Sequence, residues 1–137
     1  MKTIHTAEVT ATGGRKGHIK SNDGILDMPV QVPEGAGGKG DATNPEQLFA
    51  AGFASCFQSA LLVAALKKNI QLDPESTVRA RVSLLGEDHQ YALAVSVDVN
   101  LKGVDGEQAQ SLIDEAHDIC PISAGVRGNI EVEVNLV

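Results

Sequence analysis

The sequence predicts an α+β fold in which largely antiparallel sheets pack on two main helices, in the order βββ-α-ββ-α-β. Three observations predict this fold. The stretch from Leu48 to Leu66 carries no charge, Glu107–Ile119 repeats its apolar residues at helical spacing, and alternating or β-branched segments surround both. The 137 residues, 42% of them hydrophobic and 21% charged, have the composition of a single globular domain over residues 1–137.

Three short strands are expected before the first helix. β-branched residues predict the first strand over residues 3–11, and His18–Lys20 begins the second. Asn22–Gly24 is typical of a hairpin turn. A third strand is expected within residues 25–32, where Pro29 indicates a strand end or a sheet edge.

A central helix is expected over Pro45–Lys68. Asn44 can cap it, Pro45 suits the first helical position, and Glu46 suits the positive end. Because this helix is apolar on every side, we expect it to be buried all round. The glycine-rich loop that precedes it, Pro33–Ala42, either borders a site or simply connects the elements.

The second half of the chain predicts two strands, a helix, a loop and a last strand, in this order: Thr77–Leu85, Tyr91–Leu101, Glu107–Ile119, Pro121–Gly128 and Asn129–Val137. All three strands alternate apolar and polar residues, and for Thr77–Leu85 and its partner Tyr91–Leu101 this predicts an antiparallel pair with one solvated face. The helix is expected to end at Cys120, because a proline disfavours helical geometry in the residue before it.

Charge and composition exclude several classes of partner. The net charge is −7 and no run of Lys and Arg exceeds two residues, which argues against nucleic acid and anionic membranes. The uncharged run passes the length test for a membrane span, but it is rich in Ala, Gly and Ser and lacks Trp and Tyr at its ends. No apolar run follows Lys2, so we expect no signal peptide and a cytoplasmic location.

The two cysteines are the candidate reactive groups, since paired cysteines in a reducing compartment are more often redox-active than structural. Cys56 lies in mid-helix among apolar residues, which raises the pKa of its thiol, and Cys120 lies at a helix end whose dipole disfavours a thiolate. Cys56 therefore needs a cation to become nucleophilic, and Arg15 and Arg127 are the candidates. Spacing does not show whether the cysteines meet, and an inert core cysteine remains an alternative.

A metal site is a rival hypothesis. His117 and Cys120 are three residues apart on one helix, and Cys56 would be a third ligand. The sequence has no CxxC or HExxH motif, so we do not expect a metal. It also lacks a Walker loop, a dinucleotide fingerprint and a nucleophile elbow, and we expect no cofactor.

Several motifs together resemble the organic hydroperoxide resistance (Ohr) family of the OsmC superfamily over nearly the whole chain. The matching segments are Gly13–Arg15, Thr43–Gly52 followed by Cys56 and Phe57, Cys120–Pro121 and Arg127–Ile130. The chain departs from the family pattern at Ile122 and Ala124, where members often have Tyr and Asn.

The resemblance implies a thiol peroxidase that reduces alkyl and fatty-acid hydroperoxides and is reset by a dithiol of the dihydrolipoyl type. It also implies an intertwined homodimer with two active sites at the subunit interface. By position, Cys56 is the peroxidatic cysteine and Cys120 the resolving one, which forms a disulfide with the Cys56 sulfenic acid. Arg15 holds the thiolate and Glu46 orients Arg15. An apolar wall is expected from Phe53, Phe57, Leu26, Met28 and Ile122.

Glu46 and Cys56 are ten residues apart, which is about 15 Å along a straight helix. Arg15 therefore bridges the gap, the helix bends at Gly52, or a second subunit supplies one partner; we hypothesise a site composed across the dimer. Two alternatives to the enzyme remain, a non-catalytic thiol sensor or binding protein on the same fold, and a structural metal-binding domain.

Overall fold

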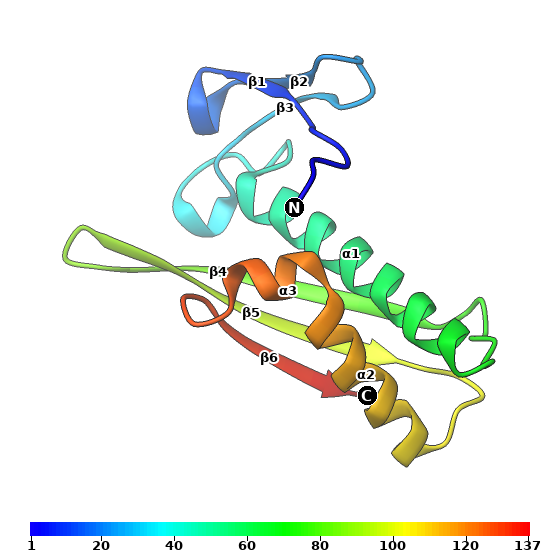
Figure 1. The fold of residues 1–137 in the computed structure, drawn as a ribbon. Helices are drawn as coiled ribbons and strands as arrows, with labels where there is room; N and C mark the ends of the chain where they lie inside the picture. Colours follow the sequence, from blue (N-terminus) through cyan, green and yellow to red (C-terminus); the bar gives the residue numbers. More distant parts are fainter. The chain divides into compact units, whose positions relative to one another are not determined.

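The computed structural model describes all 137 residues, which divide into two compact units, Met1–Leu48 and Phe49–Val137. The prediction of a single domain stays a prediction. Figure 1 gives the order of the elements along the chain.

The first unit contains an antiparallel sheet in the order β1-β2-β3, formed by Val9–Thr12, His18–Ser21 and Asp27–Pro29. The three strands and the Asn22–Gly24 turn were predicted, but β1 begins at Val9 rather than at residue 3. The pairing starts at Val9 opposite Ser21, where β2 ends, so residues 3–7 have no strand opposite them in this sheet. The third strand is also shorter than predicted and ends at Pro29, which has no N–H to continue the ladder.

The central helix α1 (Pro45–Lys67) begins as predicted, because the Asn44 side chain caps it by accepting the Gln47 N–H at 2.8 Å. In the second unit, β4 (Thr77–Glu87), β5 (Gln90–Asn100) and β6 (Glu131–Leu136) form a sheet in that order. The first pair is antiparallel and the second is parallel, so the fold remains α+β with largely antiparallel sheets.

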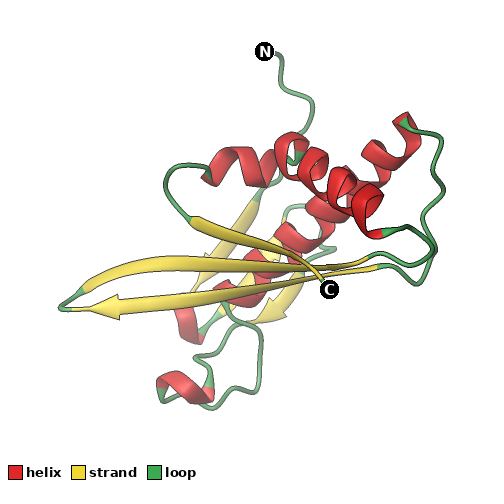
Figure 2. Cartoon of the chain, turned by 90° about the horizontal axis from the view of Figure 1, so that it is seen from below, coloured by secondary structure: helices red, strands yellow, loops and turns green.

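The helices of the second unit cover one face of this sheet (Figure 2). α2 (Gly106–Ile119) is capped by Asp105, whose side chain accepts the Gln108 N–H at 2.8 Å. The core joins apolar residues of α1, β5 and α2, of which the largest that are fully buried are Phe53, Phe57, Leu61, Val97, Val99, Leu112 and Ile113.

Two predictions about the helices are wrong. The segment after Cys120 is not a loop but a short helix, α3 (Pro121–Val126), with Pro121 at a first-turn position where its missing N–H costs nothing. α1 is not buried all round, since Leu62, Val63 and Leu66 are 54%, 47% and 76% exposed. By length and composition alone α1 could cross a membrane, a test that core helices of soluble proteins also pass.

A polar network ties the three strands of the second sheet together. Asp98 on the central strand accepts from Arg79 at 3.1 Å, from Arg81 at 2.7 Å and from Asn135 at 3.2 Å. The Asp98 side chain is only 7% exposed. The hydrogen bond from Arg79, then those from Asn135 and Arg81, lower the pKa of the Asp98 carboxyl, so it stays charged at neutral pH.

Candidate active site

The two cysteines meet although 64 residues separate them: the Cys120 thiol lies 3.4 Å from the Cys56 sulfur, within hydrogen-bonding range. Both are free thiols, Cys56 partly buried and Cys120 completely buried. Sequence spacing left this meeting open. Two thiols at this distance can form a disulfide after a small movement, because the S–S bond is about 2.05 Å long.

The helix boundary holds Cys120 in place. Its N–H donates to the Ala116 carbonyl at 2.8 Å, which completes α2, and its own carbonyl accepts the Ala124 N–H at 2.9 Å, which begins α3. Its backbone is extended, with φ −63° and ψ 119°, as expected for a residue before proline. Cys120 is therefore the junction of two helices and is fixed from both sides.

The surroundings of Cys56 do not favour a thiolate. Burial raises the pKa of the Cys56 thiol, the backbone N–H of Ile122 lowers it, and the neighbouring Cys120 thiol raises it again, so that the pKa lies above the ordinary value. Within this unit the Ile122 amide is the favourable contribution. A nucleophilic Cys56 therefore needs a further source of positive charge.

α3 approaches α1 at Gly52, one turn before Cys56. A Cβ built on Gly52 would lie 3.8 Å from the Ile122 Cδ1 atom, which is ordinary van der Waals contact. Ile122 thus packs on α1 with its side chain while its backbone N–H faces the Cys56 sulfur.

Arg15 and Glu46 form a two-pronged ion pair in the first unit, with nitrogen–oxygen distances of 3.0 and 2.7 Å. The Glu46 side chain is 15% exposed and that of Arg15 is 44% exposed. The hydrogen bonds of the pair lower the pKa of Glu46 and raise the pKa of Arg15, so both groups remain charged. Arg127, the other candidate cation, instead donates to the His117 carbonyl at 2.8 Å.

A tight turn presents Arg15 to Glu46. Residues Gly14–Lys16 form a single 3₁₀ turn, entered through Gly13 in a left-handed conformation at φ 78°. A Cβ on Gly17 would lie 1.7 Å from the Thr12 carbonyl oxygen, so only glycine fits where the turn closes.

The five predicted wall residues lie in both units. Phe53 and Phe57 are completely buried in the core, and Ile122 is half-buried beside Cys56. Leu26 and Met28 are half-buried in the first unit, Met28 opposite Ile19 in the sheet. Their role as a substrate wall stays a prediction.

Sequence reasoning gave no redox task to His117 or Ser123. Two buried side-chain polar atoms have no hydrogen-bond partner, His117 Nδ1 and Ser123 Oγ. The sequence indicated His117 only as a candidate metal ligand, and no group of three or more His, Cys, Asp or Glu side chains is placed to hold a metal ion. The spacing of three residues on either side of Cys120 was the available signal.

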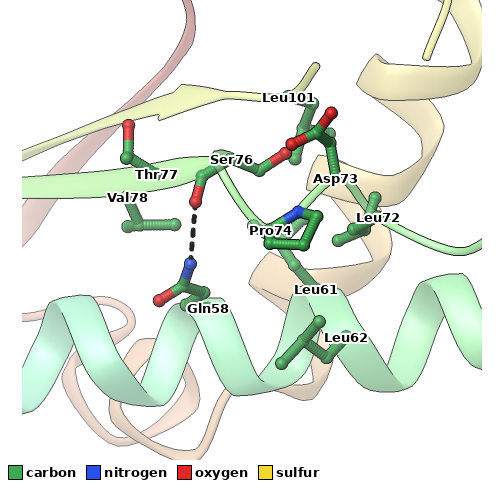
Figure 3. Close-up of a pocket in the computed structure, with 10 residues that line it drawn as sticks. All are labelled: Gln58, Leu61, Leu62, Leu72, Asp73, Pro74, Ser76, Thr77, Val78 and Leu101. Carbon is green, nitrogen blue, oxygen red and sulfur yellow. Dashed lines mark hydrogen bonds between the residues drawn. The ribbon is translucent and has the colours of Figure 1, made fainter. Parts of the chain in front are cut away.

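A separate pocket of about 240 Å³ lies between α1 and the start of β4 (Figure 3). Gln58 crosses it and donates from Nε2 to the Ser76 carbonyl at 3.1 Å, beside Leu61, Leu62 and Leu72. None of the predicted site residues lines this pocket.

Comparison with known proteins gives the family. Residues 38–135 match the family model described as OsmC-like protein. The organic hydroperoxide resistance protein OhrB of Bacillus subtilis is 44% identical over 97% of this chain and 98% of its own, and that of Xanthomonas axonopodis pv. citri is 40% identical over 98% and 96%.

Solved structures agree. The crystal structure of OhrB of Bacillus subtilis superposes with a TM-score of 0.89 at 45% identity, covering 98% of this chain and 100% of that one. An organic hydroperoxide resistance protein from Elizabethkingia anophelis gives 0.92 at 46% identity, covering 99% and 98%. The chain therefore belongs to the organic hydroperoxide resistance family of OsmC-like proteins.

Proposed function

We propose that this protein is a cysteine-based peroxidase that reduces organic hydroperoxides to alcohols. The observation that carries the proposal is the 3.4 Å separation of the Cys56 and Cys120 sulfurs, on two helices that pack in one core. The names of the relatives, organic hydroperoxide resistance proteins, support the substrate class.

In the first step, the Cys56 thiolate attacks the outer oxygen of the hydroperoxide. The O–O bond breaks, an alcohol leaves, and Cys56 becomes a sulfenic acid. The raised pKa of Cys56 makes a cation necessary, and we assign this role to Arg15. The fork of hydrogen bonds to Glu46 supports the assignment, because it fixes the guanidinium plane and keeps it charged.

In the second step, the Cys120 sulfur attacks the sulfenic sulfur of Cys56, a disulfide forms and water leaves. The complete burial of Cys120 shields this step from competing thiols. An external dithiol, of the dihydrolipoyl class, then reopens the disulfide by thiol–disulfide exchange. Because this reset needs reduced dithiols, we propose that the protein works in the cytoplasm.

The exposed apolar face of α1 supports a homodimer. Leu62, Val63 and Leu66 are neighbours on α1 and all three are exposed, and a second copy of the chain would cover them. We propose that the active site is composed across this dimer.

The test is sustained consumption of an alkyl hydroperoxide with dihydrolipoamide as the sole reductant, compared with consumption of hydrogen peroxide. We expect multiple turnovers, and faster ones with the alkyl substrate because Ile122 and Gly52 present apolar surface beside Cys56. The alternative function is a thiol sensor, which would oxidise once and stop. A single turnover that no dithiol extends would favour the sensor and reject the peroxidase.

A further inference from the structure

The two unpartnered polar atoms, His117 Nδ1 and Ser123 Oγ, stand three residues before and three residues after Cys120. Buried polar atoms without a partner are rare in folded proteins, and each one calls for an explanation. Both residues lie within one helical turn of the same cysteine along the chain. The two steps proposed above give neither group a task.

Ser123 lies in the first turn of α3, which starts directly after Cys120. The residue is 1% exposed. Its hydroxyl can donate one hydrogen bond, yet it has no acceptor while both cysteines are thiols.

His117 lies in the last turn of α2, one turn before Cys120. Residues three apart on a helix are surface neighbours, with Cβ atoms about 5–6 Å apart. The His117 ring packs against Phe57, the residue after Cys56, at 6.3 Å between ring centroids. The imidazole therefore lies on the side of α2 that faces α1, one turn before Cys120.

Cys120 needs a group that takes its proton. To attack the sulfenic acid its thiol must become a thiolate, but it is completely buried at the junction where α2 ends and α3 begins. Arg127, the nearest cation in the sequence, is bound to the His117 carbonyl.

We propose that His117 accepts the Cys120 proton, directly or through one water, and that the Ser123 hydroxyl donates a hydrogen bond to the resulting thiolate. The S–O bond of the Cys56 sulfenic acid breaks, the S–S bond forms, and the proton passes from His117 to the departing hydroxide to give water. This role rests on the proposed function for its place in the cycle.

Few other titratable groups face the imidazole. α1 offers only the Cys56 thiol near this level, and α3 has no ionisable side chain. The sheet meets the helices with valines, among them Val132 and Val134 of β6. On α2 itself, the acidic neighbours are exposed or engaged: Asp118 is exposed, Asp114 accepts from Gln110, and Glu115 pairs with Lys67 and Lys68.

The test uses no peroxide. Cys56, the more accessible thiol, is converted to a mixed disulfide with thionitrobenzoate, and the release of the coloured thiolate measures attack by Cys120. For the wild type we expect the release rate to rise with pH, because only the neutral imidazole can accept the Cys120 proton. In His117→Gln the release at pH 7 should slow about 10²-fold and this rise should disappear. Ser123→Ala should slow release about tenfold and keep the rise.

Two further measurements make the result decisive. His5→Gln, in the exposed N-terminal segment, is the matched control and should behave as wild type. Added imidazole should restore part of the rate in His117→Ala. The role of His117 would be overturned if His117→Gln released the thiolate at the wild-type rate and with the wild-type pH dependence. It would also be overturned if the release rate of the wild-type protein did not rise with pH. Since no hydroperoxide is present, failure of the peroxidase activity leaves this result valid.

Discussion

The Arg15–Glu46 pair and the Cys56–Cys120 pair differ in whether each member stabilises the charged form of the other. Each member of the ion pair shifts the pKa of the other toward the charged form. The thiols do the opposite, since burial and the second thiol keep Cys56 protonated. The ion pair thus balances its own charges, whereas a Cys56 thiolate needs a positive charge from a residue outside the thiol pair. The comparison indicates that the ion pair presents a fixed cation and the thiol pair requires one.

The largest expected effect separates the two thiols. Cys56→Ser should abolish hydroperoxide consumption, because no other residue supplies the attacking sulfur. Cys120→Ser should keep the first turnover, lose sustained turnover and let Cys56 over-oxidise to the sulfinic acid. Rapid-mixing measurement of the first turnover and the mass of the product distinguish the two variants. Equal loss of the first turnover in both would contradict the roles assigned to them.

The next effect tests the need for a fixed cation. Arg15→Lys keeps the charge but cannot form the two-pronged contact with Glu46, so the second-order rate of the first step should fall about 10²-fold. Glu46→Gln should cost less, since Arg15 stays charged. Arg127→Lys is the matched control, because Arg127 bonds only the His117 carbonyl. A first step as slow in Arg127→Lys as in Arg15→Lys would remove the distinction between the two arginines.

A smaller effect concerns the pKa of Cys56, measured by the pH dependence of its alkylation. Cys120→Ser should lower this pKa, because the Cys120 thiol is one of the groups that raise it. Arg15→Gln should raise it, because the proposed cation is lost. An unchanged pKa of the Cys56 thiol in Arg15→Gln would show that Arg15 does not stabilise the thiolate.

The smallest effect concerns Asp98. In the unit that contains both cysteines, its carboxylate accepts hydrogen bonds from Arg79, Arg81 and Asn135. Its pKa is lowered in the folded state, so its contribution to stability is present above the ordinary pKa of about 4 and is lost as the pH falls through the folded value. The thermal stability of the wild type should therefore fall below about pH 4. Asp98→Asn should be less stable than the wild type at pH 7, and its stability should change less as the pH is lowered below about 4. Asp41→Asn, at an exposed loop position, is the control and should match the wild type.

The elements that depend on local chemistry were predictable from the sequence. Asn44 and Pro45 define the start of α1, and Pro121 defines the end of α2, because caps and prolines act on adjacent residues. The alternating strands were equally plain. By contrast, α3 was missed because a six-residue helix containing Gly125 has little stability of its own and depends on packing by Ile122, Ser123 and Val126.

The site was only partly predictable from residue chemistry. The motif resemblance selected Cys56, Cys120, Arg15 and Glu46, and the structure brings them together as two pairs. The contact between Cys56 and Cys120 depends on how α1 and α2 pack, which sequence spacing does not encode. The burial of α1, by contrast, was predicted to be more complete than it is. The sequence predicts a helix buried on every side, but within a single chain one face of α1 stays exposed.

The peroxidase chemistry is tested by the intact mass of the reduced protein after one equivalent of an alkyl hydroperoxide. We expect a loss of two hydrogens, with peptide mapping that places a disulfide between Cys56 and Cys120. An unchanged mass, with both thiols still free, would contradict it and would mean that this chain keeps the fold without the peroxidase chemistry.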